Sequence, residues 1–136
     1  MDRLCIQATK STPYVCFDPA SGTFTIKGEC YPENAAAFFT PIFAWLEAFL
    51  PSHCKERGQS LGQSQGLVFD VELLYFNSSS SKALLNLFSM FECHTVQGRE
   101  ITVNWRYHAG NETVQECGEE FMEDAPNLAF NLVEIE

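Results

Sequence analysis

The chain has 136 residues, 46% of them hydrophobic, which fits a single domain with one ordinary core. Its formal net charge of −10 argues against nucleic acid and anionic membrane surfaces as partners, because both require clustered lysine and arginine. Eight of the eighteen acidic residues follow Gly110. They form either a solvated helix face or an acidic docking face for a basic partner.

The sequence shows no recognisable signal for secretion or for insertion into a membrane. The first ten residues lack the long apolar run of a signal peptide. The most apolar segment, residues 35–50, is too short and too polar to cross a bilayer. The six cysteines are scattered and include no CxxC pair, so we expect reduced thiols in a cytoplasmic protein.

The N-terminal part is rich in β-forming residues. A short strand is expected around residues 4–8, and a β-hairpin is expected over residues 14–28. Its two apolar runs flank a turn at residues 18–22, where Gly22 can supply the positive φ that such a turn needs.

The next segment has helical periodicity. Apolar residues recur at three- and four-residue spacing over residues 33–50, which predicts an amphipathic helix. Pro32 suits its first turn, whereas Pro41 is expected to kink it. Residues 52–66 are polar and contain glycine, so they are predicted to form a flexible surface loop.

An apolar strand is predicted over residues 67–76. It is apolar on both faces, so we expect a central strand that is covered on both sides. A second helix follows at once, with Leu84, Leu87, Phe88 and Phe91 on its apolar face.

The C-terminal part alternates strand and helix once more. Residues 100–107 alternate between apolar and polar and predict a half-buried strand. Residues 111–124 predict a third helix, in which Thr113 and Glu116 have capping-box spacing. Residues 128–135 predict a last strand. The order β-β-β-α-β-α-β-α-β predicts an α/β fold, in which a mixed β-sheet with an N-terminal antiparallel hairpin packs with three helices.

Catalytic motifs are nearly absent. The chain has no GxxxxGK phosphate loop and no GxGxxG after a strand, and its histidines have no partner at metal-ligand spacing. We therefore predict no metal, no cofactor and no catalytic residue. Asp70 and Glu72 share one strand face and could form a carboxylate pair, although such residues more often face solvent. A Ser–His–Asp hydrolase stays possible, because triads assemble in space, although the serine run lacks the GxSxG motif.

The junction between the apolar strand and the second helix carries Asn77 and four serines, residues 78–81. One such side chain serves as a helix cap worth about 1 kcal/mol, and a cap does not explain the whole run. The run is either a chance feature of an exposed turn or a phosphorylation target. A phosphate there would meet unpaired N–H groups and the positive helix end, a gain of about 0.3–1 kcal/mol.

Five blocks of sequence carry a family resemblance. They read ATKSTPYVCFDPASG, IKGECYPENAAAFFTPIFAWLEAFL, YFNSSSSKALLNLF, ITVNWRY and FNLVEIE. In order and spacing they resemble the SiaC family of STAS-like regulatory phosphoproteins, which is related to the STAS domains of anti-sigma-factor antagonists. The resemblance implies a single STAS-like domain over residues 1–136.

The resemblance also implies a function. Members of the family are bacterial cytoplasmic switch proteins without catalysis of their own. A dedicated protein kinase phosphorylates the residue after the asparagine, and a PP2C-type phosphatase removes the phosphate. The unmodified form activates a diguanylate cyclase, which raises cyclic di-GMP and promotes biofilm formation. The effector of this chain is then a diguanylate cyclase or another protein.

Carried over to this chain, the resemblance implies that Ser78 is the phosphoacceptor, with Ser79 as the alternative. Asn77, Ser79, Ser80 and Lys82 would form the partner-binding patch. The family commonly has threonine at the position of Ser78, and serine keeps the hydroxyl.

Three alternatives stay open. A small serine-nucleophile hydrolase would require a histidine within hydrogen-bond reach of Ser78 or Ser79. A constitutive STAS-like scaffold would use the serines to bind an anion or another small ligand. Residues 31–34, YPEN, either lie near the same surface or only open the first helix.

Overall fold

Six strands form one mixed sheet in the computed structural model, which describes residues 2–59 and 66–136, and the side chains of these except 51–59. The strands are β1 (Leu4–Ile6), β2 (Tyr14–Asp18), β3 (Thr23–Cys30), β4 (Leu67–Phe76), β5 (Ile101–His108) and β6 (Ala129–Ile135). They lie in the sheet in chain order. The first three strands pair antiparallel, whereas β3 to β6 pair parallel. The predicted mixed sheet with its antiparallel hairpin is confirmed.

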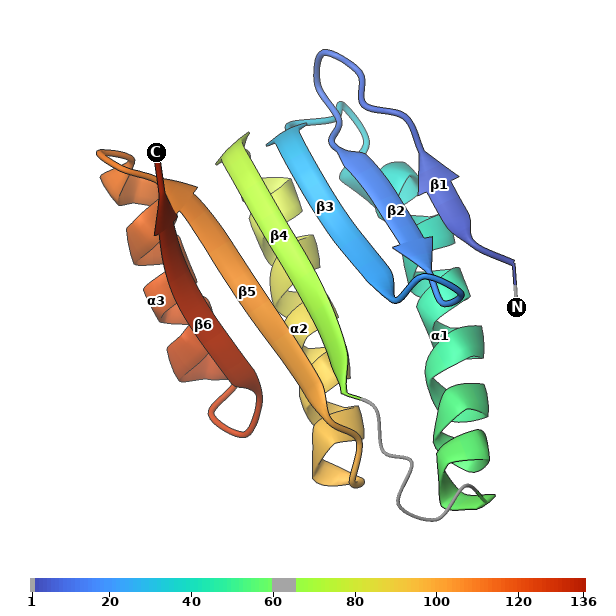
Figure 1. The fold of residues 1–136 in the computed structure, drawn as a ribbon. Helices are drawn as coiled ribbons and strands as arrows, with labels where there is room; N and C mark the ends of the chain where they lie inside the picture. The colour runs from blue at the N-terminus through green and yellow to red at the C-terminus, as the bar shows by residue number, and fades with distance from the viewer. Residues whose placement is uncertain (1, 60–65) are drawn as a thin grey trace.

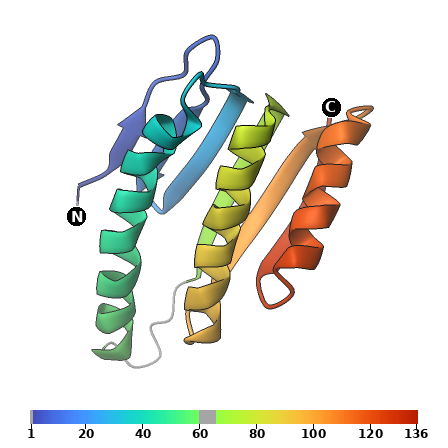
Figure 2. The ribbon, with the colours of Figure 1, turned by 180° about the vertical axis from the view of Figure 1, so that it is seen from behind.

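Three helices cover one face of this sheet. They are α1 (Ala35–Gln59), α2 (Ser78–Val96) and α3 (Glu112–Asp124). All three helices lie behind the sheet in Figure 1 and in front of it in Figure 2, which is turned by 180°. The reason is the handedness of the crossovers: right-handed connections that always step in one direction along a sheet place every helix on the same side. The result is a two-layer α/β fold with one open sheet face.

The open face corrects the expectation for β4. The strand spans Leu67–Phe76 as predicted and lies centrally in the sheet, but helices cover it on one side. Phe69 and Val71 face the helices and are buried, whereas Val68 and Leu74 are 41% and 45% exposed. Apolar residues on both strand faces therefore did not mean two covered faces here.

The first helix differs from the prediction at both ends. It begins at Ala35 rather than at residue 33, because Asn34 caps it: the Ala37 amide donates to Asn34 Oδ1 at 3.0 Å. Pro32 precedes the helix instead of opening it, and the helix runs without interruption through Pro41.

The predicted loop over residues 52–66 is wrong in its first half, since residues 52–59 are helical. Residues 60–65 lie outside the described part. Residues 52–59 continue no apolar stripe that sequence periodicity could detect, but lysine, glutamate, arginine and glutamine are good helix formers.

The third helix is capped differently from the expectation. Asn111 is the N-cap, and its Oδ1 accepts a hydrogen bond from the Val114 amide at 3.3 Å. The capping box with Thr113 and Glu116 is therefore wrong. Asparagine is at least as good a cap as threonine, so the helix starts at the first suitable residue.

Candidate functional site

The serine junction lies at the carboxyl end of β4, where α2 begins. Asn77 is the N-cap of α2: it has extended backbone angles (φ −87°, ψ 176°), and its Oδ1 accepts from the Ser80 amide at 2.9 Å. Its carbonyl accepts from the Ser81 amide at 2.9 Å, and its own amide donates to the Cys30 carbonyl of β3 at 3.1 Å. These bonds fix the first turn of α2 to the sheet.

The serines of the junction differ in exposure. Ser78 and Ser79 are exposed, Ser81 is half-buried, and Ser80 is fully buried with 0% of its surface accessible. Ser78 therefore meets the geometric requirement of a phosphoacceptor, which is access to another macromolecule. The cap satisfies the Ser80 amide and leaves the Ser78 and Ser79 amides without an acceptor within the helix.

The burial of Ser80 corrects the expectation that it contacts a partner. Its side chain faces β3, where the Cys30 thiol donates a hydrogen bond to Ser80 Oγ at 3.4 Å. Burial raises the pKa of the Cys30 thiol, and the hydrogen bond with Ser80 opposes that rise only in part. Ser80 thus belongs to the packing between α2 and the sheet.

A groove of about 520 Å³ runs between the N-terminal parts of α1 and α2. Six of its lining residues are Glu33, Asn34, Phe39, Phe43, Ser79 and Lys82. Two residues of the expected contact patch therefore share a groove with the end of the YPEN segment, so this segment does lie near the serine junction. The groove combines an apolar floor with one acidic and one basic side chain.

Aromatic side chains on the β3–β4 side of the junction were missed by sequence reasoning. Tyr75 is 52% exposed, and its ring centroid lies 5.7 Å from that of Tyr31 in an edge-on arrangement. Leu74, next to Tyr75, is also exposed. The sequence did contain a signal for them, because β4 stays apolar up to the polar junction. We interpreted that apolar character as a sign of burial. Tyr31 is half-buried, so Tyr75 is the exposed ring of this pair, and tyrosine is enriched in protein-binding surfaces.

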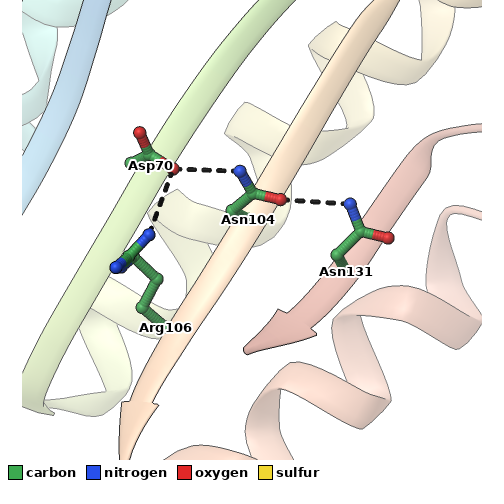
Figure 3. A network of polar contacts seen from close by, with 4 residues as sticks. All are labelled: Asp70, Asn104, Arg106 and Asn131. Carbon is green, nitrogen blue, oxygen red and sulfur yellow. Dashed lines mark hydrogen bonds and ion pairs between the residues drawn. The ribbon is translucent and has the colours of Figure 1, made fainter. Parts of the chain in front are cut away.

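A row of polar side chains crosses the open face of the sheet (Figure 3). Asn104 Nδ2 donates to Asp70 Oδ1 at 3.0 Å, and Asn131 Nδ2 donates to Asn104 Oδ1 at 3.0 Å. The three residues are register partners on β4, β5 and β6, and Arg106 Nη1 lies 3.9 Å from Asp70 Oδ1. Asp70, Asn104 and Arg106 are half-buried and Asn131 is exposed. The Arg106–Asp70 ion pair is partly open to solvent, and such pairs add little stability.

The same geometry bears on the carboxylate pair. Glu72 Oε2 lies 3.3 Å from His108 Nε2, so Asp70 and Glu72 interact with different partners across the sheet. They lie two residues apart on the same face of β4, the face that the helices leave open.

The serine-nucleophile alternative requires a nearby histidine. His94 lies in the last turn of α2, at the opposite end of the helix from Ser78, and His108 interacts with Glu72. Neither forms a hydrogen bond with Ser78 or Ser79 among the side chains described, and the side chain of His53 lies outside them. The described geometry therefore offers this alternative no support.

Within residues 2–50 and 66–136, whose side chains the structure describes, no three His, Cys, Asp or Glu residues come together as a possible metal site. No helix in the same part of the chain has both the length and the apolar character needed to span a membrane.

Comparison with known proteins identifies the family. The model for the SiaC family regulatory phosphoprotein matches residues 6–135. The chain belongs to the SiaC family. A protein of Pseudomonas aeruginosa strain UCBPP-PA14, described as uncharacterized, is 36% identical over 124 residues, which cover 91% of this chain and 90% of that protein.

Solved structures agree with the SiaC fold. Apo-SiaC from Pseudomonas aeruginosa matches with a TM-score of 0.79 and 32% identity, over 98% of this chain and 99% of that one. SiaC also matches in a crystal structure of the diguanylate cyclase SiaD in complex with its activator SiaC, from the same organism, with a TM-score of 0.81 and 32% identity, over 97% and 99%. The family resemblance and the fold class are thus confirmed. SiaC proteins are regulatory phosphoproteins rather than enzymes.

Proposed function

We propose that this SiaC-family chain is a cytoplasmic phospho-switch, in which phosphorylation of Ser78 controls binding to a diguanylate cyclase in cyclic di-GMP signalling. The observation that carries the proposal is the exposed Ser78 at the capped start of α2, beside a groove that faces outward. Similarity to an activator bound to a diguanylate cyclase supports the choice of effector. A kinase and a PP2C-type phosphatase complete the cycle.

Ser78 is preferred as the acceptor because of its place relative to the cap. It is the first residue of α2 and directly follows Asn77, as the resemblance requires. Ser79 is also exposed and stays the alternative acceptor. Its second role, as a lining residue of the groove, makes it a contact residue in this proposal. Ser80 takes neither role in this proposal, because its side chain is completely buried.

The phosphate acts on the surface and leaves the fold unchanged. It adds a charge of about −1.5 to −2 and three acceptor oxygens next to amides that lack helical acceptors. The helix dipole stabilises this charge by about 0.3–1 kcal/mol, so the modified chain stays folded. A docked effector must instead desolvate the dianion, which costs several kcal/mol, and each 1.4 kcal/mol lowers affinity about tenfold.

The binding surface consists of Asn77, Ser79 and Lys82 together with the groove between α1 and α2. Lys82 is the exposed cation of this surface and lies one helical turn beyond Ser78. In the unmodified chain its ammonium is available to an acidic side chain of the effector. A phosphate on Ser78 or Ser79 would compete for the same ammonium, which adds to the loss of effector affinity.

Binding measurements with point variants test the proposal. We expect Ser78→Ala to bind a diguanylate cyclase of the same organism like the wild type, and Ser78→Asp to bind at least tenfold more weakly in calorimetry. Ser89→Ala and Ser89→Asp are the matched controls, because Ser89 is an exposed serine further along α2. Equal affinities of the two Ser78 variants would contradict the assignment, as would mass spectrometry of fragmented peptides that places the phosphate on another residue. A scaffold that binds an anion constitutively would also give equal affinities.

A further inference from the structure

Two cysteines face each other across the N-terminal edge of the sheet. Cys5 in β1 and Cys16 in β2 are direct register partners in the antiparallel pair. Val15 and Phe17, the neighbours of Cys16 in β2, are buried toward the helices. Leu4 and Ile6, the neighbours of Cys5 in β1, pack against the same core. Cys5 and Cys16 therefore point to the open face. Cys5 is exposed and Cys16 is half-buried, and both are free thiols. The pair is therefore open to small molecules in solution.

The register places the Cα atoms of Cys5 and Cys16 within the range found in disulfides. Directly opposed residues of an antiparallel pair have Cα atoms about 4.5 or 5.5 Å apart, depending on the hydrogen-bonding position. Disulfides occur at Cα separations of about 4.4–6.8 Å, so either position is compatible with a bond. Their Cβ atoms need to approach by about 0.7–1.7 Å, from about 4.5–5.5 Å in opposed residues to the mean of about 3.8 Å in a disulfide. β1 is a three-residue edge strand, which makes such a small shift possible.

Polar side chains lie beside the two cysteines. Tyr14 lies two residues before Cys16 and therefore on the same face of β2. Hydrogen bonding to Cys16 and the charge of Cys16, and then burial and Cys5, raise the pKa of the Tyr14 hydroxyl. Gln7 Nε2 donates to Cys5 Sγ at 3.7 Å. Cys5, Cys16 and Tyr14 thus lie on the same face of the β1–β2 pair.

The other described cysteines lack this arrangement. Cys30 is buried against Ser80, and burial raises the pKa of its thiol. Burial, and then the charges of Glu120 and Glu116, raise the pKa of the Cys117 thiol. Cys93 is exposed and lies on a helix, α2, so no strand partner faces it. Among the described residues, Cys5 and Cys16 are the one directly opposed pair of thiols.

We propose that Cys5 and Cys16 form a reversible redox modification site that takes a hydroperoxide as its oxidant. The Cys5 sulfur, the more exposed one, attacks one peroxide oxygen; the O–O bond breaks, the departing oxygen leaves as water, and Cys5 becomes a sulfenic acid. The Cys16 sulfur then attacks the Cys5 sulfur, the S–O bond breaks and a second water leaves. Two thiols lose two electrons and two protons in total, and hydrogen peroxide is reduced to two waters. A dithiol reverses the bond by exchange.

The bond would fasten the N-terminal edge of the molecule. It closes a loop over residues 5–16 and ties β1 to β2 covalently. The segment before β1 also contacts α1, because Trp45 Nε1 donates to the Asp2 carbonyl at 2.8 Å. We therefore expect the oxidised chain to melt several degrees above the reduced chain.

Peptide mapping tests the proposal on the full chain. Trypsin cleaves after Lys10, between the two cysteines, so a disulfide between them joins two separate peptides. After treatment with hydrogen peroxide, we expect the 4–10 and 11–27 peptides to be cross-linked in a monomer that has lost two hydrogen atoms. Dithiothreitol should restore both. A double variant, Cys54→Ser with Cys93→Ser, removes two competing thiols. The wild-type chain is mapped in the same way, so the test still holds if the double variant fails to fold.

Single substitutions separate the two roles. With Cys16→Ser, the Cys5 sulfenic acid has no resolving thiol and should accumulate as a dimedone adduct; with Cys5→Ser, oxidation of Cys16 should slow at least severalfold. Cys93 in the wild-type chain is the reference for an exposed lone thiol. Two results would overturn the proposal. The first is oxidation of Cys5 and Cys16 without an intramolecular cross-link. The second is an oxidation rate that equals the rate of Cys93 and does not change when the chain is unfolded in urea.

Discussion

Asn77 accepts a hydrogen bond from the Ser80 amide at 2.9 Å, and this bond holds the two residues between them at the surface. Ser78 and Ser79 are exposed because the cap turns the chain from β4 into α2 within one residue. Ser80, at the far end of the same bond, is buried against Cys30. One short turn thus separates the side chains that a partner can reach from the one that packs in the core.

The cap predicts a stability difference. Replacing Asn77 by alanine removes the acceptor for the Ser80 amide and should lower the free energy of unfolding by about 1 kcal/mol, within a range of about 0.5–2 kcal/mol. Urea denaturation followed by circular dichroism measures the change. Asn77→Asp keeps an acceptor at the same place and serves as the control. A value for Asn77→Ala equal to wild type would show that the cap does not stabilise α2.

The contrast between Ser79 and Ser80 gives a second prediction. Ser80→Asp places a carboxylate where no surface is accessible, and should destabilise the chain by about 3 kcal/mol or more. Ser79→Asp adds the same charge at an exposed position near the helix N-terminus and should be neutral or slightly stabilising. Thermal unfolding of the two variants decides the matter. Similar melting temperatures would mean that Ser80 is not buried as described.

The contact between α3 and β5 gives a third prediction. A Cβ atom on Gly118 would clash with Cδ1 of Trp105, a residue that is 1% exposed and whose Nε1 donates to the Val114 carbonyl at 2.9 Å. Gly118→Ala should therefore cost about 1–3 kcal/mol by overpacking, although alanine is the better helix former. Chemical denaturation measures the cost, with the exposed neighbour Glu119→Ala as control.

A partial rescue would identify the cause. Trp105→Phe leaves room beside α3, so the penalty of Gly118→Ala should be smaller in that background. Equal penalties in both backgrounds would assign the loss to something other than the Trp105 ring.

His94 predicts a dependence of stability on pH. Its Nδ1 is buried without a hydrogen-bond partner among the residues described. Burial, and then the positive charge of Arg99, lower the pKa of His94 below its ordinary value of 6.5. The unfolded chain therefore binds a proton more readily than the folded one, and stability is retained above about pH 6.5 and lost as pH falls toward the folded pKa.

The measurement compares the wild type with His94→Gln at about pH 7.5 and about pH 5.5. Between the higher and the lower pH, the free energy of unfolding should fall more for the wild type than for the variant, because glutamine does not titrate. Parallel curves for the two proteins would contradict a lowered pKa at this position.

Local sequence rules predicted the strands well. The hairpin turn was recognisable because Gly22 has to adopt a φ of 75°, and the bounds of β4 followed from an apolar run that ends at Asn77. The alternation over residues 100–107 likewise gave β5 to within one residue at each end. These features depend on neighbours in the chain, and the sequence displays them directly.

Long-range features could not be predicted in the same way. The open sheet face follows from the hand of three crossovers, and the apolar pattern of β4 gave the opposite impression. The burial of Ser80 depends on Cys30, fifty positions away, so four consecutive serines looked equivalent. The role of Asn34 in the groove required the packing of α1 beside α2.

The strand order has a consequence for how the molecule is made. Each strand of the sheet hydrogen-bonds to the one synthesised immediately before it, from β1 through β6. As the chain leaves the ribosome, every new strand finds its template already in place, and none has to be inserted between two strands that are already joined. The nascent protein can grow from one side by simple addition, and the last strand to emerge only has to dock on an exposed border.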